Sequence, residues 1–538
     1  MRYIIHDGEI CDGSGEKPYK GDILLEGKVI RQIAKKDGVS GGISRDVEGI
    51  HIEAEGMTVT PGFIDTHRHC DIAALYDENF GQLELAQGLT SVVGGNCGLG
   101  IFPCTEEHKE EIFNYVEPCL GIAPKDMWIS GYPEYAQMLK KRGAPLHVGC
   151  YQGLGAVEAA VRGYGKSPLT QKESDLAKGY IREALEAGCP GISSGIMYQP
   201  ECYFSEEEIT ELLKAAAPYG KPLACHIRGE GDNLVPSVKE IIHLCKKAEI
   251  PLNISHFKAT GIKNWGKNIH QAIELIEEAR ASGQDVTVDF YPYCGGSTTL
   301  ISLVPPDIME EDLKATFRKM MTSEGKKALK ASLYREHPGW DNMVTAIGWE
   351  RIRISSVTKD ENRDLVGLDF KAASLKRGCE EPAYLMAELL AMEEGKVGII
   401  LLSMSQEDVD TVAALPYSML ISDALYGVSD CPHPRLYGSF PHFLQEYVVK
   451  GKKISLEQAV RKMTSMPAQR LNLKKRGLIC EGFYGDLNIF KLEAFRDHAT
   501  YENSKKLSNF PDYVFTDGSP AVEKGKFIKE NRAEILSL

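Results

Sequence analysis

The sequence contains no apolar run long enough to cross a membrane and no tract of basic residues. A membrane-spanning helix needs roughly 18 consecutive apolar residues, and no stretch approaches that length. The chain carries 62 basic and 76 acidic residues, a net charge of −14, so neither nucleic acid nor an anionic membrane is an expected partner. Residues 1–5 lead directly into a strand-like pattern and not into a signal peptide. We therefore expect a cytoplasmic protein.

Cysteine is sparse and is never paired at short spacing. The 14 cysteines among 538 residues fall well below the density of a disulfide scaffold, and the Cys-x-x-Cys spacing is absent. This excludes a zinc ribbon and a thioredoxin-like redox site. The hydrophobic fraction of 43% and charged fraction of 26% are typical of a globular protein and exclude a mainly disordered, collagen-like or coiled-coil chain.

Short strand-like runs separated by turns occupy both ends of the chain. Residues 3–5, 22–25 and 29–33 show this pattern near the start, and similar runs follow residue 485. Because chain termini often lie close together in a domain, we predict one split domain. It is a small β-sandwich built from residues 1–56 and 480–538.

Between these ends, apolar runs of strand length alternate with helical patterns. The alternation predicts parallel strands joined by right-handed crossovers, and eight such units match an eightfold β/α (TIM-like) barrel over residues 57–479. A doubly wound open sheet is the competing architecture. The eight runs centre on Val59, Val92, Val148, Ile192, Ala224, Ile254, Val288 and Leu420.

A ninth apolar run does not fit the count of eight. It covers residues 397–402 and follows a region that has polar helical segments and no clear repeat. We interpret residues 294–396 as an insertion within the barrel that forms a lid, because long loops in compact domains are usually functional. The ninth run itself has no predicted place in the sheet.

Side chains that can bind metal stand at the carboxyl ends of five predicted strands, where sites lie in α/β folds. Any one of them alone is more simply a core histidine, a buried thiol or a helix N-cap. Their coincidence, in a chain with only 14 histidines, predicts a site for zinc or another divalent transition ion. They are His67, His69, Cys97, His226, His256 and Asp423.

Such a site predicts metal-assisted hydrolysis. A divalent ion lowers the pKa of a bound water from 15.7 to about 7 and polarises a carbonyl group. A carboxylate in contact with that water can accept its proton and later give it to the leaving amine. Asp423 is the candidate for this role.

Several short motifs point to a family. The run Pro-Gly-Phe-Ile-Asp-Thr-His-Arg-His at 61–69 resembles the opening signature of the metal-dependent amidohydrolase superfamily. Gly-Gly-Asn-Cys-Gly at 94–98 and Ser-Ser-Gly-Ile-Met-Tyr-Gln-Pro at 193–200, with Ser-His-Phe-Lys at 255–258, resemble its N-acyl-D-amino-acid deacylase (D-aminoacylase) branch. The resemblance spans nearly the whole chain. It implies hydrolysis of a small N-acylated D-amino acid to a carboxylate and the free D-amino acid.

The resemblance also implies roles for the candidate ligands. Cys97 would take the place of the carboxylated lysine of many relatives, and His226 and His256 would complete a site that binds one zinc ion tightly. His67 and His69 would contribute to a second, weaker site. Asp423 would be the catalytic acid/base and would also contact metal.

The implied substrate carries a carboxylate, which needs a cationic partner. By resemblance, Lys258 and Arg435 bind it, and the fork of an arginine suits a carboxylate. Tyr198 and one of Tyr291 and Tyr293 are candidates to donate phenolic hydrogen bonds to substrate. The sequence leaves open which of these two tyrosines faces the site.

Three other functions remain as alternatives. A cyclic-amide hydrolase of the dihydroorotase or hydantoinase type usually has a carboxylated lysine late in the fourth strand, whereas residues 190–195 contain no lysine. A nucleophilic Cys97 with a histidine base would make an amidase that is sensitive to thiol alkylation and insensitive to chelation. A catalytically silent barrel would bind a carboxylated ligand without turnover.

Overall fold

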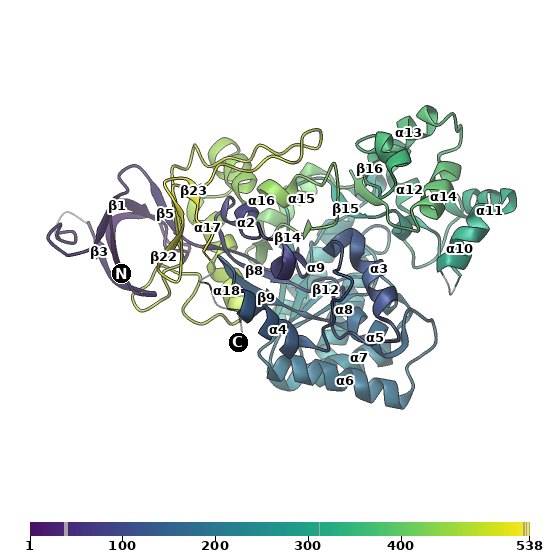
Figure 1. Ribbon diagram of the computed structural model, residues 1–538, viewed down its shortest axis with the longest axis horizontal. Coiled ribbons are helices and arrows are strands. Elements are labelled where there is room, and N and C mark those ends of the chain that lie inside the picture. The colour runs from purple at the N-terminus through teal and green to yellow at the C-terminus, as the bar shows by residue number, and fades with distance from the viewer. Residues whose placement is uncertain (37–40, 311–312, 531–532, 534, 537–538) are drawn as a thin grey trace.

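The two ends of the chain form one sheet. The computed structural model describes residues 1–36, 41–310, 313–530, 533 and 535–536. A nine-stranded sheet has the order β23-β22-β21-β20-β5-β1-β2-β3, with β4 paired to β1, and lies at the left of Figure 1. Its strands are β1 (Arg2–Ile10), β2 (Tyr19–Glu26), β3 (Val29–Lys35), β4 (Ile50–Glu53), β5 (Thr58–Pro61), β20 (Leu487–Phe490), β21 (Tyr513–Thr516), β22 (Ser519–Glu523) and β23 (Lys526–Phe527).

The antiparallel pair β5–β20 joins the N-terminal strands to the C-terminal ones. Ile23 and Leu25 from one end share a buried core with Leu487 and Phe515 from the other, so each half covers apolar surface that the other half alone would leave exposed. The sequence predicted a small β-sandwich here, and the hydrogen bonds connect its strands in one continuous sheet.

The first apolar run proved to be two strands. The run centred on Val59 is β5 and belongs to the terminal sheet, so the prediction that it opens the parallel series was wrong. That series begins after Gly62, with Phe63. A Cβ at Gly62 would lie 2.1 Å from Thr90 Oγ1, so the glycine allows the close approach at which the chain changes sheets.

The middle of the chain contains parallel strands that pair in sequence order. They form the ladders β6-β8-β9 and β10-β11-β12-β13-β14-β18, and β10 follows β9 after one residue. The chain after β6 also pairs with the chain after β18, through β7 (Arg68–His69) and β19 (Ala424–Leu425). The strands of the ladders are β6 (Phe63–Asp65), β8 (Leu89–Gly94), β9 (His147–Cys150), β10 (Gln152–Gly153), β11 (Ile192–Gly195), β12 (Leu223–His226), β13 (Leu252–Ile254), β14 (Val286–Phe290) and β18 (Ser418–Leu420).

Helices follow the strands, and side-chain caps mark where several begin. Thr170 and Glu173 form a capping box at the start of α6, as Ser205 and Glu208 do at α7. All six residues of β8 are buried, as expected for a strand covered on both faces. The helices are α1 (Ala73–Tyr76), α2 (Gln82–Leu85), α3 (Lys109–Leu120), α4 (Tyr132–Arg142), α5 (Leu154–Arg162), α6 (Gln171–Glu186), α7 (Glu206–Ala216), α8 (Leu234–Ala248), α9 (Asn268–Ala281), α15 (Gln406–Ala414), α16 (Arg435–Phe443), α17 (Leu456–Met463) and α18 (Ser465–Arg470).

The segment between β14 and β18 has a core of its own. The unplaced ninth run is β17 (Gly398–Leu401), which pairs antiparallel with β15 (Gly296–Thr299) and β16 (Ile352–Ser356). The apolar cluster of this segment includes Phe317, Met386 and Ile399, and it lies at the upper right of Figure 1. Its helices are α10 (Leu313–Met320), α11 (Ser323–Leu333), α12 (Met343–Ile347), α13 (Phe370–Lys376) and α14 (Pro382–Met392).

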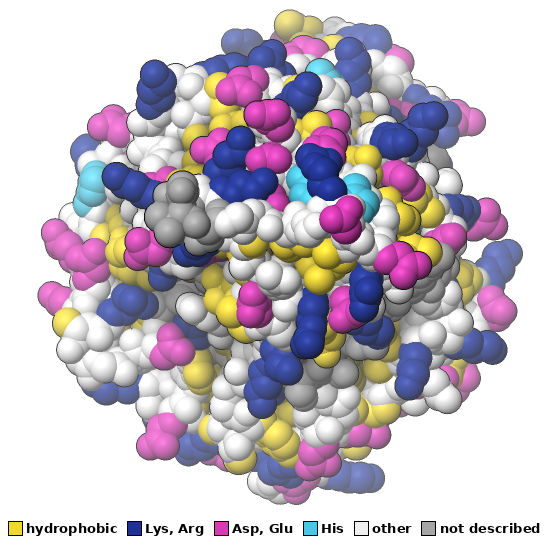
Figure 2. All heavy atoms as spheres, turned by 90° about the vertical axis from the view of Figure 1, so that its left-hand side faces the viewer, with side chains coloured by type: hydrophobic (Ala, Val, Ile, Leu, Met, Phe, Trp, Pro, Cys, Tyr) yellow, Lys and Arg dark blue, Asp and Glu magenta, His cyan; other side chains and the backbone are white. Residues whose placement is uncertain are grey.

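The surface at the left of Figure 1 carries charges of both signs. Figure 2 shows acidic and basic side chains interspersed over this face. Among the described residues, every helix is too short or too polar to span a bilayer.

Candidate metal centre and active site

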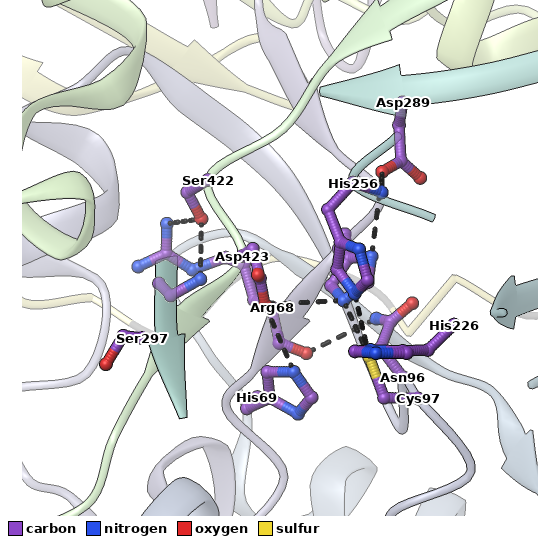
Figure 3. Close-up of polar contacts among 12 residues, drawn as sticks. Arg68, His69, Asn96, Cys97, His226, His256, Asp289, Ser297, Ser422 and Asp423 are labelled. Atoms are coloured by element: carbon purple, nitrogen blue, oxygen red, sulfur yellow. Dashed lines mark hydrogen bonds and ion pairs between the residues drawn. The ribbon is translucent and has the colours of Figure 1, made fainter. Parts of the chain in front are cut away.

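The six predicted ligands come together although they arise from five separate parts of the chain. Cys97 Sγ lies 3.3 Å from His67 Nε2 and 3.5 Å from His256 Nε2. Asp423 Oδ1 lies 3.5 Å from His67 Nε2 and 3.4 Å from His69 Nε2. The donor atoms of Cys97, His226 and His256 lie within 4.8 Å of one another, and Figure 3 shows their side chains converging.

Three of these residues stand where the backbone is left-handed. Cys97 has φ 57°, His256 has φ 37° and Asp423 has φ 51°, a region that non-glycine residues rarely occupy. Each follows the carboxyl end of a parallel strand, and the turn directs its side chain into the space above the strands. Strained backbone of this kind clusters at functional sites.

The donor set fits a metal ion. Both ring nitrogens of His226 and Nδ1 of His69 are buried without a hydrogen-bond partner, which is costly unless another group satisfies them. Burial holds the pKa of His226 and of His256 well below the usual range, so both are neutral imidazoles able to donate a lone pair. One thiol with two or three imidazoles and a carboxylate is the kind of set that binds zinc.

Burial acts on the two anionic candidates in different ways. It raises the pKa of the Cys97 thiol well above its usual range, and the Asp423 charge adds to the effect. A coordinated cation has the opposite effect, because it lowers the pKa of a thiol and deprotonates it. For Asp423, burial raises the pKa, but Arg435 and the neighbouring histidines outweigh it and hold the pKa well below its usual range. Asp423 is therefore an ionised carboxylate.

A second layer of charged residues orients His256. Glu230 Oε1 lies 3.0 Å from His256 Nδ1, and Asp289 Oδ1 accepts the His256 backbone N–H at 2.5 Å. A carboxylate on one ring nitrogen fixes which nitrogen faces the metal. Neither Glu230 nor Asp289 is among the residues predicted from the sequence. Glu230 follows His226 by four residues in the same loop, a position where barrel enzymes carry functional residues.

Four of the five predicted substrate-binding residues surround one pocket, which opens to solvent. Tyr198, Lys258, Tyr291 and Arg435 line it together with His226, His256 and Asp423. Tyr293 is not among the lining residues and stacks on the His442 ring at a centroid distance of 4.5 Å. Of the two tyrosines that the sequence left open, Tyr291 faces the pocket.

Arg435 connects the pocket to the candidate acid/base. Its Nη1 lies 2.9 Å from Asp423 Oδ2, and its guanidinium carbon lies 4.7 Å from the centre of the Tyr291 ring. Only 1% of Arg435 is exposed, yet its Nε has no hydrogen-bond partner. A buried cation with an unused N–H beside the ligand cluster is suited to bind an anionic group of a substrate.

The chain resembles known proteins along its whole length. A D-aminoacylase from Alcaligenes xylosoxydans xylosoxydans is 27% identical over 99% of this chain and 97% of the relative. An N-acyl-D-glutamate deacylase from the same organism is 28% identical over 96% of this chain and 92% of the relative. Residues 418–521 match the model of the amidohydrolase family.

A solved structure resembles the whole fold. The N-acyl-D-glutamate deacylase of Bordetella bronchiseptica, in complex with zinc and a phosphonate inhibitor, superposes with a TM-score of 0.82 at 25% identity, and the match covers 100% of this chain and 99% of the other. The chain is similar to amidohydrolases over its whole length, and these relatives indicate a hydrolytic enzyme that acts on amides. Its mixed α/β fold is the fold of these relatives.

In this amidohydrolase, a buried ionic network joins the ends of β6 and β18 beneath Asp423. Ser422 Oγ donates to Asp65 Oδ2 at 2.5 Å, and Arg68 Nη1 donates to both groups, at 3.2 Å to Asp65 and 3.1 Å to Ser422. Figure 3 shows Arg68 beside Ser422. The Asp423 N–H then donates to His67 O at 2.9 Å. The network fixes the position of Asp423 relative to the histidines. The sequence did not predict this role for Asp65, Arg68 or Ser422.

The segment between β15 and β17 supplies part of the amidohydrolase pocket. Trp340, Asp341 and Met343 line it. The Asp341 carboxylate accepts the backbone N–H groups of Glu230 and Gly231, each at 2.7 Å. This carboxylate therefore attaches the segment to the loop that carries Glu230.

Proposed function

We propose that this amidohydrolase hydrolyses the amide bond of N-acyl-D-amino acids and releases a carboxylic acid and the free D-amino acid. The observation that carries the proposal is one pocket in which a cysteine–histidine donor set, an ionised Asp423 and a buried Arg435 face the same space. The D configuration follows the relatives, which are a D-aminoacylase and an N-acyl-D-glutamate deacylase.

The donor set supports zinc as the cofactor. We assign Cys97, His226 and His256 to one tightly bound Zn²⁺, and His67, His69 and Asp423 to a second, weaker site. When bound, the ion supplies a Lewis acid that polarises the amide carbonyl and makes a neighbouring water acidic. The N-acyl-D-glutamate deacylase of Bordetella bronchiseptica also binds zinc.

Asp423 moves the proton. Its ionised carboxylate accepts a proton from the attacking water and gives it to the nitrogen of the leaving amino acid, which departs as a neutral amine. Arg435 holds the α-carboxylate of the substrate through its unused Nε–H, and Tyr198 and Tyr291 donate phenolic hydrogen bonds. Lys258 also lines the pocket, and its Nζ lies 2.5 Å from Glu230 Oε1, which balances its charge.

The arrangement of the strands supports the proposed architecture. We assign the parallel series, from β6 to β18, to an eightfold barrel within residues 57–479, and the contacts between β7 and β19 support its closure. Residues 1–56 and 480–538 form the split β-domain, with β5 added to it. Residues 294–396 form a lid, extended to include β17. Limited proteolysis tests the lid: a substrate analogue should slow cleavage within residues 294–401, and unchanged cleavage contradicts it.

The thiols support the proposed location. All 14 cysteines are free, as expected in a reducing compartment, so we assign the protein to the cytoplasm.

The test of the reaction is chiral analysis of the methionine released from racemic N-acetyl-methionine. We expect only D-methionine, from the zinc-loaded enzyme and not after chelation. Release that survives chelation contradicts the zinc assignment, and release that is lost on thiol alkylation but not on chelation favours a Cys97 nucleophile. Release of the L isomer contradicts the stereochemistry.

A cyclic-amide hydrolase is the weaker candidate. β11 (Ile192–Gly195) reads Ile-Ser-Ser-Gly and offers no lysine for the carboxylated ligand that this class usually carries. Including dihydroorotate and a hydantoin in the same assay tests it, and turnover of either one without turnover of N-acetyl-methionine would favour it.

A further inference from the structure

We infer that the preferred substrate carries an uncharged, apolar amino-acid side chain, and that the pocket rejects acidic side chains because its other cations are already neutralised. The inference rests on the proposed function and narrows its substrate class. Sequence similarity does not decide the point, since a D-aminoacylase and an N-acyl-D-glutamate deacylase are almost equally similar to this chain. The charges in the pocket decide which side chain is preferred.

Among the described residues, three cationic side chains line the pocket, and Arg228 is the first. Its Nε and Nη2 both contact the Glu240 carboxylate, at 3.1 and 3.0 Å, and its Nη1 donates to Cys202 O at 3.1 Å. This paired contact with Glu240 is the strong arrangement for an arginine and a carboxylate. Arg228 therefore offers no net charge to a ligand.

Lys258 is the second cation, and its charge is also balanced. Nζ donates to Glu230 Oε1 at 2.5 Å and to His256 O at 2.8 Å. These contacts use two of the three N–H donors of the ammonium group, and the Glu230 carboxylate balances its charge. A second substrate carboxylate would have to compete with Glu230 for Lys258.

Arg435 is the third cation and has one obvious use. Asp423 Oδ2 lies 2.9 Å from its Nη1, but its Nε–H has no partner, and we assign this N–H to the α-carboxylate that every N-acyl amino acid carries. A further carboxylate on the side chain would find no free cation and would lie among three pocket carboxylates, those of Glu230, Asp341 and Asp423. An unpaired charge in such a site is strongly disfavoured.

Apolar side chains form part of the remaining wall, and the hydroxyl-bearing residues Thr260, Ser297, Thr298, Ser302 and Ser403 line the pocket as well. The apolar part suits an aliphatic or thioether side chain, which loses water contact without leaving a polar group unpaired. The side chains that form it are Leu99, Met197, Trp340, Met343, Leu401 and Leu425.

The experiment measures kcat/KM of the zinc-loaded enzyme for N-acetyl-D-methionine, N-acetyl-D-glutamine and N-acetyl-D-glutamate. Glutamine has nearly the shape of glutamate without its charge. We expect methionine to exceed glutamate by at least ~100-fold and glutamine to exceed it by at least ~10-fold, because the site rejects the charge. A glutamate value equal to or above the other two overturns the inference but leaves the proposed function intact. Absence of turnover with every N-acyl-D-amino acid refutes the proposed function itself.

A variant tests whether the pairing of Arg228 with Glu240 causes the rejection of acidic side chains. Glu240→Gln removes the carboxylate that neutralises Arg228 and so leaves a free cation at the pocket wall; Glu240 does not line the pocket. We expect the glutamate-to-methionine ratio of kcat/KM to rise ~10-fold, which is ~1.4 kcal/mol, with the methionine value changed less than about twofold. Glu211→Gln is the matched control, because Glu211 pairs with Lys178 and Lys214 outside the pocket. An equal ratio in both variants overturns the role assigned to the Arg228–Glu240 pair.

Discussion

The buried network between β6 and β18 gives the most direct test of how Asp423 is held in place. Asp65 accepts four hydrogen bonds: Arg68 Nη1 at 3.2 Å and Ser422 Oγ at 2.5 Å on Oδ2, and the backbone N–H groups of His67 and Ser422, each at 3.2 Å, on Oδ1. Asp65→Asn keeps the volume of the side chain but removes its charge and turns one acceptor into a donor. Asp65 and Arg68 are both fully buried.

The loss of stability in Asp65→Asn can be estimated from the contacts that Arg68 keeps. Removing one partner of a buried ion pair costs about 3–5 kcal/mol. Arg68 keeps Glu84, whose Oε1 lies 3.2 Å from Nη2, so we expect the lower end, about 3 kcal/mol. Because Ser422 precedes Asp423, the carboxylate of Asp423 should also shift, and kcat should fall roughly tenfold or more while KM changes less.

The assay is urea unfolding followed by circular dichroism, combined with steady-state kinetics on N-acetyl-D-methionine. Thr90→Val is the control, because it removes a buried hydroxyl beside β6 whose hydrogen bond to Phe63 O is long, at 3.5 Å. It should cost less than about 1 kcal/mol. A loss below about 1 kcal/mol for Asp65→Asn, or an unchanged kcat, would refute the view that this network positions Asp423.

Three further predictions concern single side chains. Asp423→Asn should lower kcat by roughly 10²–10⁴-fold while atomic absorption still finds zinc bound at Cys97, His226 and His256; normal turnover would exclude Asp423 as acid/base. Tyr291→Phe should raise KM several-fold and Tyr293→Phe should not, and equal effects would contradict the assigned orientation. Burial raises the pKa of Glu201 to about 7, above its unfolded value, so its contribution to stability is lost as pH rises from about 4.5 to about 7 and amounts to about 3 kcal/mol. Urea unfolding at pH 5 and 8 should show this loss relative to Glu201→Gln but not relative to Glu207→Gln, which alters an exposed residue.

The ligand cluster was predictable because topology constrains it. In a series of parallel strands, the carboxyl ends all meet at one face, so polar side chains at strand ends must be neighbours even when they lie far apart in the sequence. Cys97 and Asp423 are an example. Predicting that they are neighbours needed only strand positions, which the apolar runs indicate, and no knowledge of the loops; the role of Cys97 as a zinc ligand is implied by the family resemblance.

Strand positions do not predict the roles of residues whose partners lie in loops. Glu230, Arg228 and Asp341 all act in the pocket, yet what each does depends on a partner from another loop. Tyr291 and Tyr293 share a parity that would point them to the same side of a strand. The chain leaves β14 at Phe290, so that alternation no longer applies beyond it, and packing decides which ring enters the pocket.

The burial of a charged side chain is also difficult to predict from the sequence. Arg68 stands between His67 and His69 in the ligand motif, and its charge suggests an exposed position. It is instead fully buried between Asp65, Glu84 and Tyr426. Tyr426 lies 358 residues away in the sequence, and a single sequence carries no sign of such a pairing. The incorrect prediction that β5 opens the parallel series has the same origin, since contacts with distant strands decide which sheet an apolar run joins.

The backbone is strained at three of the candidate ligands, which lowers the stability of the fold. Cys97, His256 and Asp423 have φ values of 57°, 37° and 51°, where glycine is the unstrained choice and another residue costs roughly 1 kcal/mol or more. Glycine would relieve each turn and remove the side chain that the pocket needs. Keeping a thiol, an imidazole and a carboxylate at three strained positions within one site is therefore difficult to explain by stability. A requirement for those three donors at the same point in space explains it, and the proposed metal centre with an adjacent proton carrier would impose that requirement.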